Sequence, residues 1–180
     1  MKVIAQTAAL QEALGLTGSI VATRTPKPVL QCLKLIAADG VLTLLATDLE
    51  AGCRYQIAAV QIEEEGEALV PADRLVGIVR ESTGDEHLTL ETEKQTLHVR
   101  GAGSHFTIFG FDPEEYPAVA EFTEAADFQI PAFLLGKMIS KTLFATAKAH
   151  SHYAISGVLW EAAGKKLQLV ATDGHRTGHR

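Results

Sequence analysis

Alternating apolar and polar residues predict half-buried β-strands over much of the chain. The alternation covers residues 88–91 and 96–99, and residues 105–109 continue it. Turn-forming residues separate pairs of apolar runs at Ala37–Gly40 and at Ala162–Lys165, which predicts β-hairpins at both places. The sequence therefore favours antiparallel sheets in which each strand buries one face.

Apolar residues at helical spacing follow two prolines, Pro71 and Pro131. A proline suits the first turn of a helix, where its missing N–H breaks no hydrogen bond. The apolar face of each predicted helix consists of Leu75, Ile78 and Val79 in one and Leu135, Met138 and Ile139 in the other. A further helix is predicted after the apolar run 3–5, and its apolar residues are Leu10, Ala13 and Leu14.

The predicted helices belong to an internal repeat. Residues 70–79 and 130–139 share the pattern apolar-Pro-Ala-x-x-Leu-x-x-apolar-apolar, with their prolines 60 positions apart. Leu42–Asp48 resembles Leu167–Asp173 at a spacing of 125 positions, and the first predicted helix falls on the third in the same register. Together these spacings describe a unit of about sixty residues that contains a strand, a helix and a run of antiparallel strands.

Three such units are expected to begin near residues 1, 66 and 126. Two of them make a complete domain, residues 1–122, and the third makes the first half of a second domain, residues 123–180. The acidic, proline-containing stretch Asp112–Pro117 is predicted to be a surface linker. A half-domain without its partner unit is expected to leave sheet edges and apolar helix faces exposed.

Charge is distributed unevenly along the chain. The formal net charge of −6 by itself argues against nucleic-acid binding. Residues 130–150, however, contain no Asp or Glu and carry Lys137, Lys141 and Lys148, so they form a candidate electropositive face. Lys137 and Lys141 are four positions apart and are expected to share one helical face. A second basic group consists of Arg24, Lys27 and Lys34.

Composition and cysteine usage favour a cytoplasmic globular protein. Hydrophobic residues make up 47% and charged residues 21%, which fits a folded chain and argues against disorder. Cys32 and Cys53 lack metal-ligand spacing, so reduced thiols are the simplest interpretation and no disulfide is expected. We expect neither a membrane span nor a signal peptide, because Gln6, Thr7 and Gln11 interrupt the only early apolar run.

Five short motifs, in order along the chain, are similar to those of the bacterial DNA sliding clamp family, the beta subunit of DNA polymerase III. They are Thr25–Leu30, Ala46–Glu50, Leu69–Ala72, Glu115–Pro117 and Ala171–Arg176. The resemblance implies an α+β DNA-clamp fold, in which duplicated strand–helix–strands units place helices on one face of the sheets. It also implies a non-catalytic processivity factor for DNA replication, without cofactor or metal, whose three-domain protomers pair into a ring around DNA.

The resemblance implies partners and site residues as well. Sequence-independent contacts with double-stranded DNA would involve Arg24, Lys27, Lys137, Lys141, Lys148, His150 and Tyr153. A pocket for peptides of partners, among them the polymerase catalytic subunit and the clamp loader, would involve Ile155, Thr172, Gly174, His175 and Arg176. The homodimer would use Arg74, Ile78, Phe106 and Ile108. Relative to the family, the chain lacks half of the second domain and the whole third domain, so we expect that it does not close a ring alone.

Several of these interpretations have simpler alternatives. The lysines can belong to an ordinary solvated helix face, and residues 172–174 can be a plain hairpin turn. Thr177 stands where the family usually has an apolar residue, which weakens the expected pocket wall.

Two other functions stay open at this point. A metal-dependent hydrolase would use the cluster of His150, His152, His175 and His179. Against it, the sequence has no H-E-x-x-H, paired C-x-x-C or G-x-S-x-G motif. A protein-binding domain without a DNA role would fit the acidic net charge.

Overall fold

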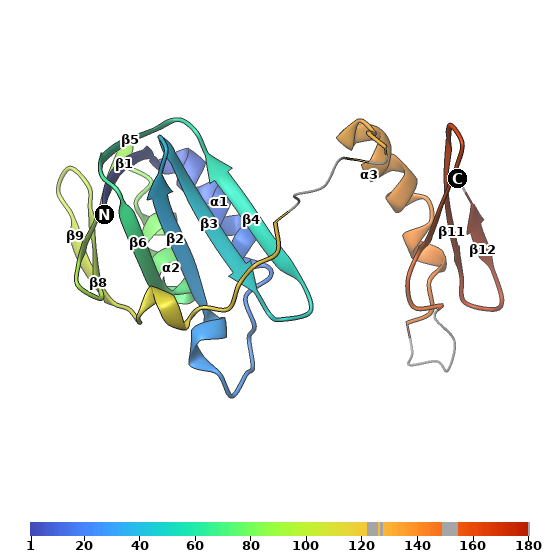
Figure 1. Ribbon diagram of the computed structural model, residues 1–180, viewed down its shortest axis with the longest axis horizontal. Helices are drawn as coiled ribbons and strands as arrows, with labels where there is room; N and C mark the ends of the chain where they lie inside the picture. Colours follow the sequence, from blue (N-terminus) through green and yellow to red (C-terminus); the bar gives the residue numbers. More distant parts are fainter. Residues whose placement is uncertain (122–125, 127, 149–154, 180) are drawn as a thin grey trace. The chain divides into compact units, whose positions relative to one another are not determined.

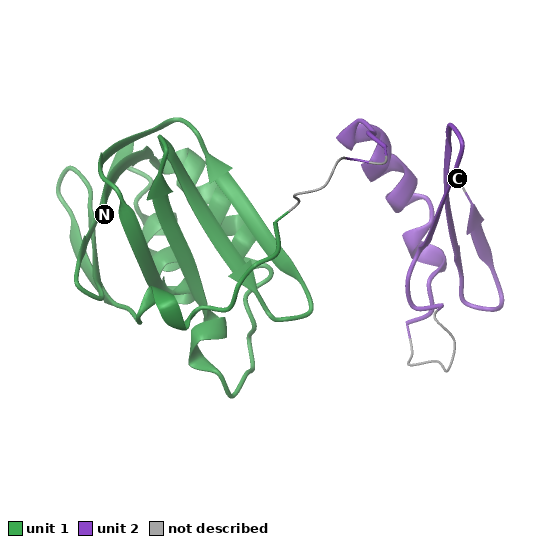
Figure 2. Cartoon of the chain, viewed as in Figure 1, with its two compact units in different colours: residues 1–122 green, residues 123–180 purple. Residues whose placement is uncertain are grey.

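The computed structural model describes residues 1–121, 126, 128–148 and 155–179. The chain divides into two compact units, residues 1–122 and residues 123–180, which Figure 2 shows in green and purple. In the described residues, unit 1 has two antiparallel sheets and the helices α1 and α2, and unit 2 has one antiparallel sheet and the helix α3.

Unit 1 runs through the order strand, helix, strands twice. The first run consists of β1 (Lys2–Gln6), α1 (Thr7–Gly18), β2 (Cys32–Ala38), β3 (Val41–Thr47), β4 (Gly52–Ile57) and β5 (Val60–Glu64). The second run consists of β6 (Gly66–Pro71), α2 (Ala72–Glu81), β7 (His87–Glu93), β8 (Thr96–Arg100) and β9 (His105–Phe109). These elements confirm the duplicated strand–helix–strands architecture that the internal repeat predicts.

The strands of unit 1 form two antiparallel sheets, one with the order β4-β3-β2-β6 and one with the order β5-β1-β7-β8-β9. Inward residues alternate where the sequence predicts it in β7 and β8, whose Leu88, Leu90, Leu97 and Val99 are fully buried. Leu33 and Leu35 of β2 are fully buried on the side that carries the helices. Figure 1 shows α1 and α2 together on this side of the four-stranded sheet. The main core therefore lies between the paired helices and the sheets.

The helices form where apolar residues recur every three or four positions. In α1, Leu10, Ala13 and Leu14 are buried, and in α2 Leu75 and Val79 are fully buried. Pro71 and Pro131 occupy the N-cap positions of their helices, one residue earlier than the predicted first turn. The proline still removes no helical hydrogen bond, because the cap residue donates none to the helix.

The segment that follows β9 packs on the outer face of the four-stranded sheet. Of the predicted surface linker Asp112–Pro117, Glu114 and Glu115 are exposed, but Tyr116 is buried. Tyr116 is buried with Cys32, Leu45 and Leu69 in a second apolar cluster. The Tyr116 hydroxyl accepts a hydrogen bond from the Thr47 N–H (3.0 Å) and donates one to the Cys32 carbonyl (3.4 Å). Acid and proline mark the surface part of this segment, whereas Tyr116, together with Phe111 and Val119, attaches it to the apolar cluster.

Burial also controls the chemistry of the two side chains at the centre of this cluster. It raises the pKa of the Cys32 thiol to about 11, so the thiol stays protonated at neutral pH. It raises the pKa of Tyr116 as well, although the hydrogen bond from Thr47 acts in the opposite direction. Both cysteines are free.

Unit 2 contains α3 (Ala132–Ser140), a 3-10 turn at Leu143–Ala145, and the strands β10 (Leu159–Ala163), β11 (Lys166–Thr172) and β12 (Thr177–His179). The strands form one sheet with the order β10-β11-β12. No residue of α3 is fully buried. Large apolar side chains are exposed on this unit at Phe133, Leu134, Leu143, Phe144, Leu159 and Trp160.

One predicted strand is missing from unit 2: residues 128–130, before Pro131, have no regular structure. The equivalent strand of unit 1 is β1, which pairs with both β5 and β7. At the repeat spacing of 125 positions, the counterparts of β5 and β7 fall after residue 180. The described residues of unit 2 contain neither counterpart, so the residues before Pro131 lack the two strands with which β1 pairs in unit 1. Among the described residues, no helix is long and apolar enough to span a membrane.

Candidate functional site

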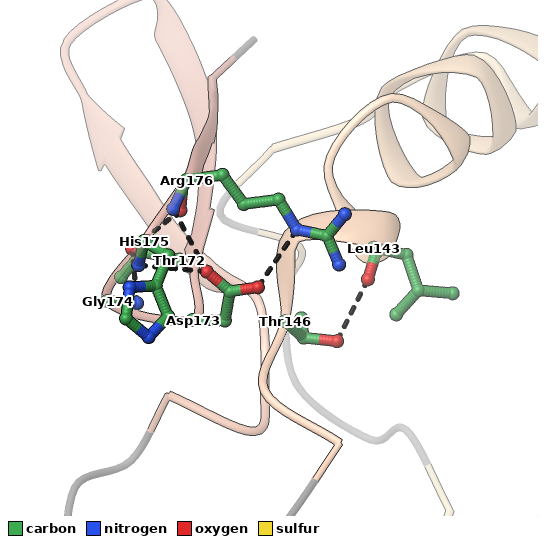
Figure 3. Close-up of polar contacts among 7 residues, drawn as sticks. All are labelled: Leu143, Thr146, Thr172, Asp173, Gly174, His175 and Arg176. Atoms are coloured by element: carbon green, nitrogen blue, oxygen red, sulfur yellow. Dashed lines mark hydrogen bonds and ion pairs between the residues drawn. The ribbon is translucent and has the colours of Figure 1, made fainter.

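The loop between β11 and β12, Thr172–Arg176, is held by its own side chains. The Thr172 hydroxyl accepts a hydrogen bond from the Gly174 N–H (3.1 Å) and donates one to the Arg176 carbonyl (2.8 Å). One carboxylate oxygen of Asp173 accepts the N–H groups of His175 and Arg176, both at 3.0 Å. Figure 3 shows the Asp173 carboxylate between this backbone and the Arg176 side chain. The loop is therefore a fixed frame rather than an unconstrained turn.

Asp173 is the organising charge of this loop. Its second carboxylate oxygen accepts a hydrogen bond from Arg176 Nε at 2.9 Å. The N–H groups of His175 and Arg176, and then the Arg176 side chain, hold the pKa of Asp173 below its ordinary value. Gly174 has a φ of +88°, which favours glycine, and an added Cβ would meet no atom within 4 Å. The frame thus presents an open backbone edge beside the exposed His175.

An aromatic side chain borders the frame. The Arg176 guanidinium lies over the Phe144 ring, 5.8 Å from its centroid, and Phe144 is 57% exposed. Phe144 belongs to the 3-10 turn that supports β12, because a Cβ at Gly178 would come within 3.1 Å of Thr142 Cα. The carbonyl of Ile155 accepts a hydrogen bond from the Ala147 N–H (2.9 Å), which ties the next segment to the same turn. The structure therefore brings all five predicted peptide-site residues into unit 2 and gathers four of them in one loop.

The predicted DNA-contact residues lie on surfaces of both units. Arg24 and Lys27 are exposed in the segment between α1 and β2, and Lys137 is exposed on α3. Lys141 follows the last helical residue as the C-cap in helical conformation, and Lys148 is also exposed. These five side chains form no ion pair with another residue of the described part. His150 and Tyr153 lie outside the described residues.

The two units differ in charge. Residues 1–122 carry nine Lys and Arg against eighteen Asp and Glu, whereas residues 123–180 carry seven against four. Unit 1 is therefore net negative and unit 2 net positive. The negative charge of the whole chain hides a basic second unit, which is the part that carries Lys137, Lys141 and Lys148.

The four residues predicted for a subunit contact surround one groove of about 540 Å³ between α2 and β9. Arg74 and Ile78 come from α2, and Phe106 and Ile108 come from the edge strand β9. Ile108 is only 4% exposed, so its side chain belongs mainly to the core and offers the groove little surface. Phe106 is 40% exposed and supplies the larger apolar surface.

The residues described give no support to a histidine metal centre in unit 2. Among residues 1–121, 126, 128–148 and 155–179, no group of three or more His, Cys, Asp or Glu side chains is arranged to hold a metal ion. His175 and His179 are exposed on the β11–β12 hairpin. His150 and His152, the other two members of the predicted cluster, lie outside the described residues.

Sequence reasoning missed three residues that shape these sites. Asp173 was recognisable, because Asp followed by Gly is a common turn signal in which the carboxylate accepts nearby N–H groups. Phe144 gave no signal, because its proximity to Arg176 arises only when the 3-10 turn packs under β12. Phe109 also lines the groove beside β9 and is 78% exposed, although strand alternation places it opposite Phe106 and Ile108.

The chain matches two family models in sequence order. Residues 1–120 match the DNA polymerase III beta subunit, N-terminal domain, and residues 129–180 match its central domain. It is 33% identical over 171 residues to the beta sliding clamp of Pseudomonas aeruginosa. The matched region covers 95% of this chain and 47% of that protein. It is 32% identical over 153 residues to the Escherichia coli K12 clamp, which covers 85% and 42%.

Solved structures agree with the sequence matches. The fold superposes on the DNA polymerase III beta subunit from Pseudomonas aeruginosa with a TM-score of 0.89 and 33% identity, over 98% of this chain and 48% of that one. The sliding clamp from Bacillus subtilis gives a TM-score of 0.92 at 26% identity, over 100% and 49%. The chain spans about half the length of the curated relatives it matches. It belongs to the family of DNA polymerase III beta subunits, the beta sliding clamps.

Proposed function

We propose that this chain forms the N-terminal and central part of a processivity clamp for DNA replication. Such a clamp encircles double-stranded DNA as a homodimer in the cytoplasm and catalyses no reaction itself. It tethers the polymerase catalytic subunit and is placed on DNA by a clamp loader. The observation that carries the proposal is that both units match consecutive domains of one family, in the same order.

The charge distribution supports the DNA part of the proposal. A sliding ring needs favourable contacts with phosphates and no contacts that read the bases. Helix α1 carries no Lys or Arg, so it is a poor candidate for this surface. The positive charge comes from the α1–β2 segment with Arg24 and Lys27, and from unit 2 with Lys137, Lys141 and Lys148. His150 and Tyr153 remain part of the proposed contact set.

The β11–β12 loop supports a site for a short linear peptide of a partner protein. A peptide gains most from a surface that is already ordered, because less conformational entropy is lost on binding. Asp173 orders the loop, Gly174 leaves the backbone accessible, and His175 and Arg176 are exposed beside it. Ile155 would add apolar surface to the same site.

The groove between α2 and β9 supports a contact between protomers. Edge strands that keep one side unpaired are open to a second chain. Here the edge strand β9 stands next to Arg74 and Ile78 of α2, and Phe106 provides an exposed aromatic anchor. Aromatic and arginine side chains contribute strongly to interfaces.

The test uses the full-length protein that contains these residues, loaded on a circular plasmid that is then cut with a restriction enzyme. The wild-type clamp should remain on circles and leave linear DNA. The double variant Lys137→Glu with Lys141→Glu should leave circles at least severalfold faster, because two attractive phosphate contacts become repulsive. The matched control is Lys165→Glu with Lys166→Glu, which changes the same charge at the exposed β10–β11 hairpin.

Two outcomes would contradict the proposal at different levels. Equal release from circular and linear DNA for the wild-type protein would exclude a topological clamp. Unchanged retention of the Lys137 and Lys141 variant, with a normal ring, would remove these lysines from the DNA surface and leave the clamp function intact. Circular dichroism spectra of all variants establish that the fold is preserved.

A further inference from the structure

Two histidines meet on the exposed face of the five-stranded sheet in unit 1. His98 lies on β8 and His105 on the edge strand β9, and these strands pair in antiparallel register. His98 Nδ1 lies 3.2 Å from His105 Nε2, and the ring centroids are 5.3 Å apart. The Thr107 hydroxyl lies 3.3 Å from the same His98 nitrogen. Neither histidine belongs to the residue sets assigned above to DNA or to a peptide.

The spacing of the two nitrogens fits one metal ion. Zinc–imidazole bonds are about 2.0–2.1 Å long, and tetrahedral geometry then places two ligand nitrogens about 3.3 Å apart. The observed 3.2 Å is therefore already close to the separation that a shared ion requires. An ion would replace the hydrogen bond between the rings, with the remaining proton of each neutral imidazole on its other nitrogen.

The charged residues next to His98 and His105 pair with each other and leave both imidazole rings free to bind an ion. Glu91 of β7 lies opposite His98 in the strand register, and Arg100 lies opposite His105. Arg100 Nη2 is 3.2 Å from the Glu91 carboxylate, so the nearest positive and negative charges neutralise each other. Because His98 is partly exposed and His105 is exposed, water can complete the coordination shell.

We propose that His98 and His105 form a two-nitrogen binding site for a divalent transition-metal ion, which ties the edge strand β9 to β8. Imidazole nitrogens favour zinc, nickel and copper ions over magnesium and calcium, which prefer oxygen ligands. The ion would fix the strand that carries Phe106 and Ile108 in the groove beside α2. The inference does not depend on the clamp function, because it uses only the geometry of one β-hairpin.

The experiment is a zinc chloride titration of the 180-residue chain, followed by NMR of the imidazole nitrogens. This readout separates the individual histidines, so binding elsewhere on the chain does not obscure the result. The His98 Nδ1 and His105 Nε2 resonances are expected to shift together and to saturate at one ion per pair. The resonances of His87, an exposed histidine on β7, are expected to stay in place. Magnesium chloride at the same concentrations should shift neither member of the pair.

Single substitutions then test whether the two rings act as one site. His98→Ala should abolish the response of His105, and His105→Ala should abolish the response of His98, whereas His87→Ala should leave both responses intact. The backbone amide spectrum establishes that each variant keeps the fold. The proposal is overturned if zinc shifts neither ring, or if one ring still responds with the same saturation after the other is removed.

Discussion

The two units use the same loop frame in different ways. Residues 47–51 join β3 to β4, and residues 172–176 join β11 to β12. In both loops the first residue is a threonine whose hydroxyl accepts the N–H two positions later and donates to the carbonyl four positions later. In both, the next residue is an aspartate. Its carboxylate accepts hydrogen bonds from the backbone N–H groups two and three positions later. The repeat therefore preserves a hydrogen-bond frame as well as a sequence pattern.

The difference lies in what covers each frame. In unit 1 the Thr47 N–H is bound by Tyr116, and Val119 packs so closely that a Cβ at Gly52 would lie 3.0 Å from it. In unit 2 the loop carries His175 and Arg176 where unit 1 has Glu50 and Ala51. All four residues are exposed, so the loops differ here in side-chain chemistry and not in exposure. The hydrogen-bonded loop therefore supplies an ordered backbone in both units, and the surrounding residues determine which groups bind to it.

The largest expected effect comes from removing Tyr116, which packs against the loop of residues 47–51 in unit 1. Tyr116→Ala should lower the free energy of unfolding of unit 1 by about 3–5 kcal/mol, because it leaves a cavity in the second cluster. Tyr116→Phe should cost about 1–3 kcal/mol, since a buried N–H and a buried carbonyl lose their partner. Urea unfolding followed by far-UV circular dichroism measures both changes.

Two controls locate this effect. Tyr55→Phe removes another tyrosine hydroxyl, which bonds to Glu12 at an exposed position, and should leave stability unchanged. Trp160, the only tryptophan, reports on unit 2, so its fluorescence transition should stay in place. Unchanged stability of Tyr116→Ala would mean that the segment after β9 does not stabilise unit 1.

The third residue of each loop is Leu49 in unit 1 and Gly174 in unit 2, so each can be replaced by the residue of the other loop. Leu49 has a φ of +78° and Gly174 a φ of +88°, so both adopt the left-handed region that glycine favours. Gly174→Leu should destabilise unit 2 by about 1–2 kcal/mol. Leu49→Gly should change stability little, because relief of backbone strain is offset by the greater freedom of glycine in the unfolded chain.

Trp160 fluorescence during urea unfolding measures the Gly174 effect. The matched control is Gly157→Leu, because Gly157 does not have a positive φ and an added Cβ there meets no atom within 4 Å. An equal cost at Gly157 and Gly174 would attribute the change to leucine exposure and not to the frame.

The fourth position should separate the two frames in binding. In the full-length protein, His175→Ala should weaken a clamp-binding peptide by about fivefold, on the order of 1 kcal/mol, whereas Glu50→Ala should not. His175→Glu, which makes the second loop resemble the first, should weaken it at least as much. Fluorescence polarisation of a labelled peptide measures these affinities. Equal affinity of wild type and His175→Ala would exclude His175 from the peptide site.

The smallest expected effect concerns the two aspartates. Backbone N–H groups of Ala51 and Glu50 lower the pKa of Asp48, and those of His175 and Arg176 lower the pKa of Asp173, both relative to 3.8. A carboxyl group whose pKa is lowered by folding stabilises the fold at pH values above its unfolded-state pKa. This stabilisation is lost as the pH falls through the folded-state pKa. Arg176→Ala should raise the pKa of Asp173 slightly and leave that of Asp48 unchanged.

Carbon-13 NMR titration of the carboxyl groups measures both aspartates in one sample. Midpoints of Asp48 and Asp173 at or above 3.8 would contradict the role of the two loops in holding the charge.

Local signals predicted most elements of the fold. Alternation located β7, β8 and β9, and the turn residues before Val41 and Lys166 located two hairpins. Helical periodicity located all three helices within a few residues. Helices α1 and α2 bury one face against the core, whereas no residue of α3 is fully buried. The strand predicted before Pro131 is absent because a strand forms only when it pairs with neighbouring strands. The local sequence pattern does not show whether such neighbours exist.

The sequence also determined the frame at residues 172–176, since Thr, Asp and Gly at successive positions bond to their own backbone. Only the tertiary structure decided what surrounds it. Phe144 meets Arg176, Tyr116 closes the first frame, and His98 faces His105 because packing joins segments that local preferences leave independent. Hydrogen bonds within a loop depend on a few adjacent residues, whereas the cover of a loop depends on contacts between distant ones, and these exist only in the folded chain.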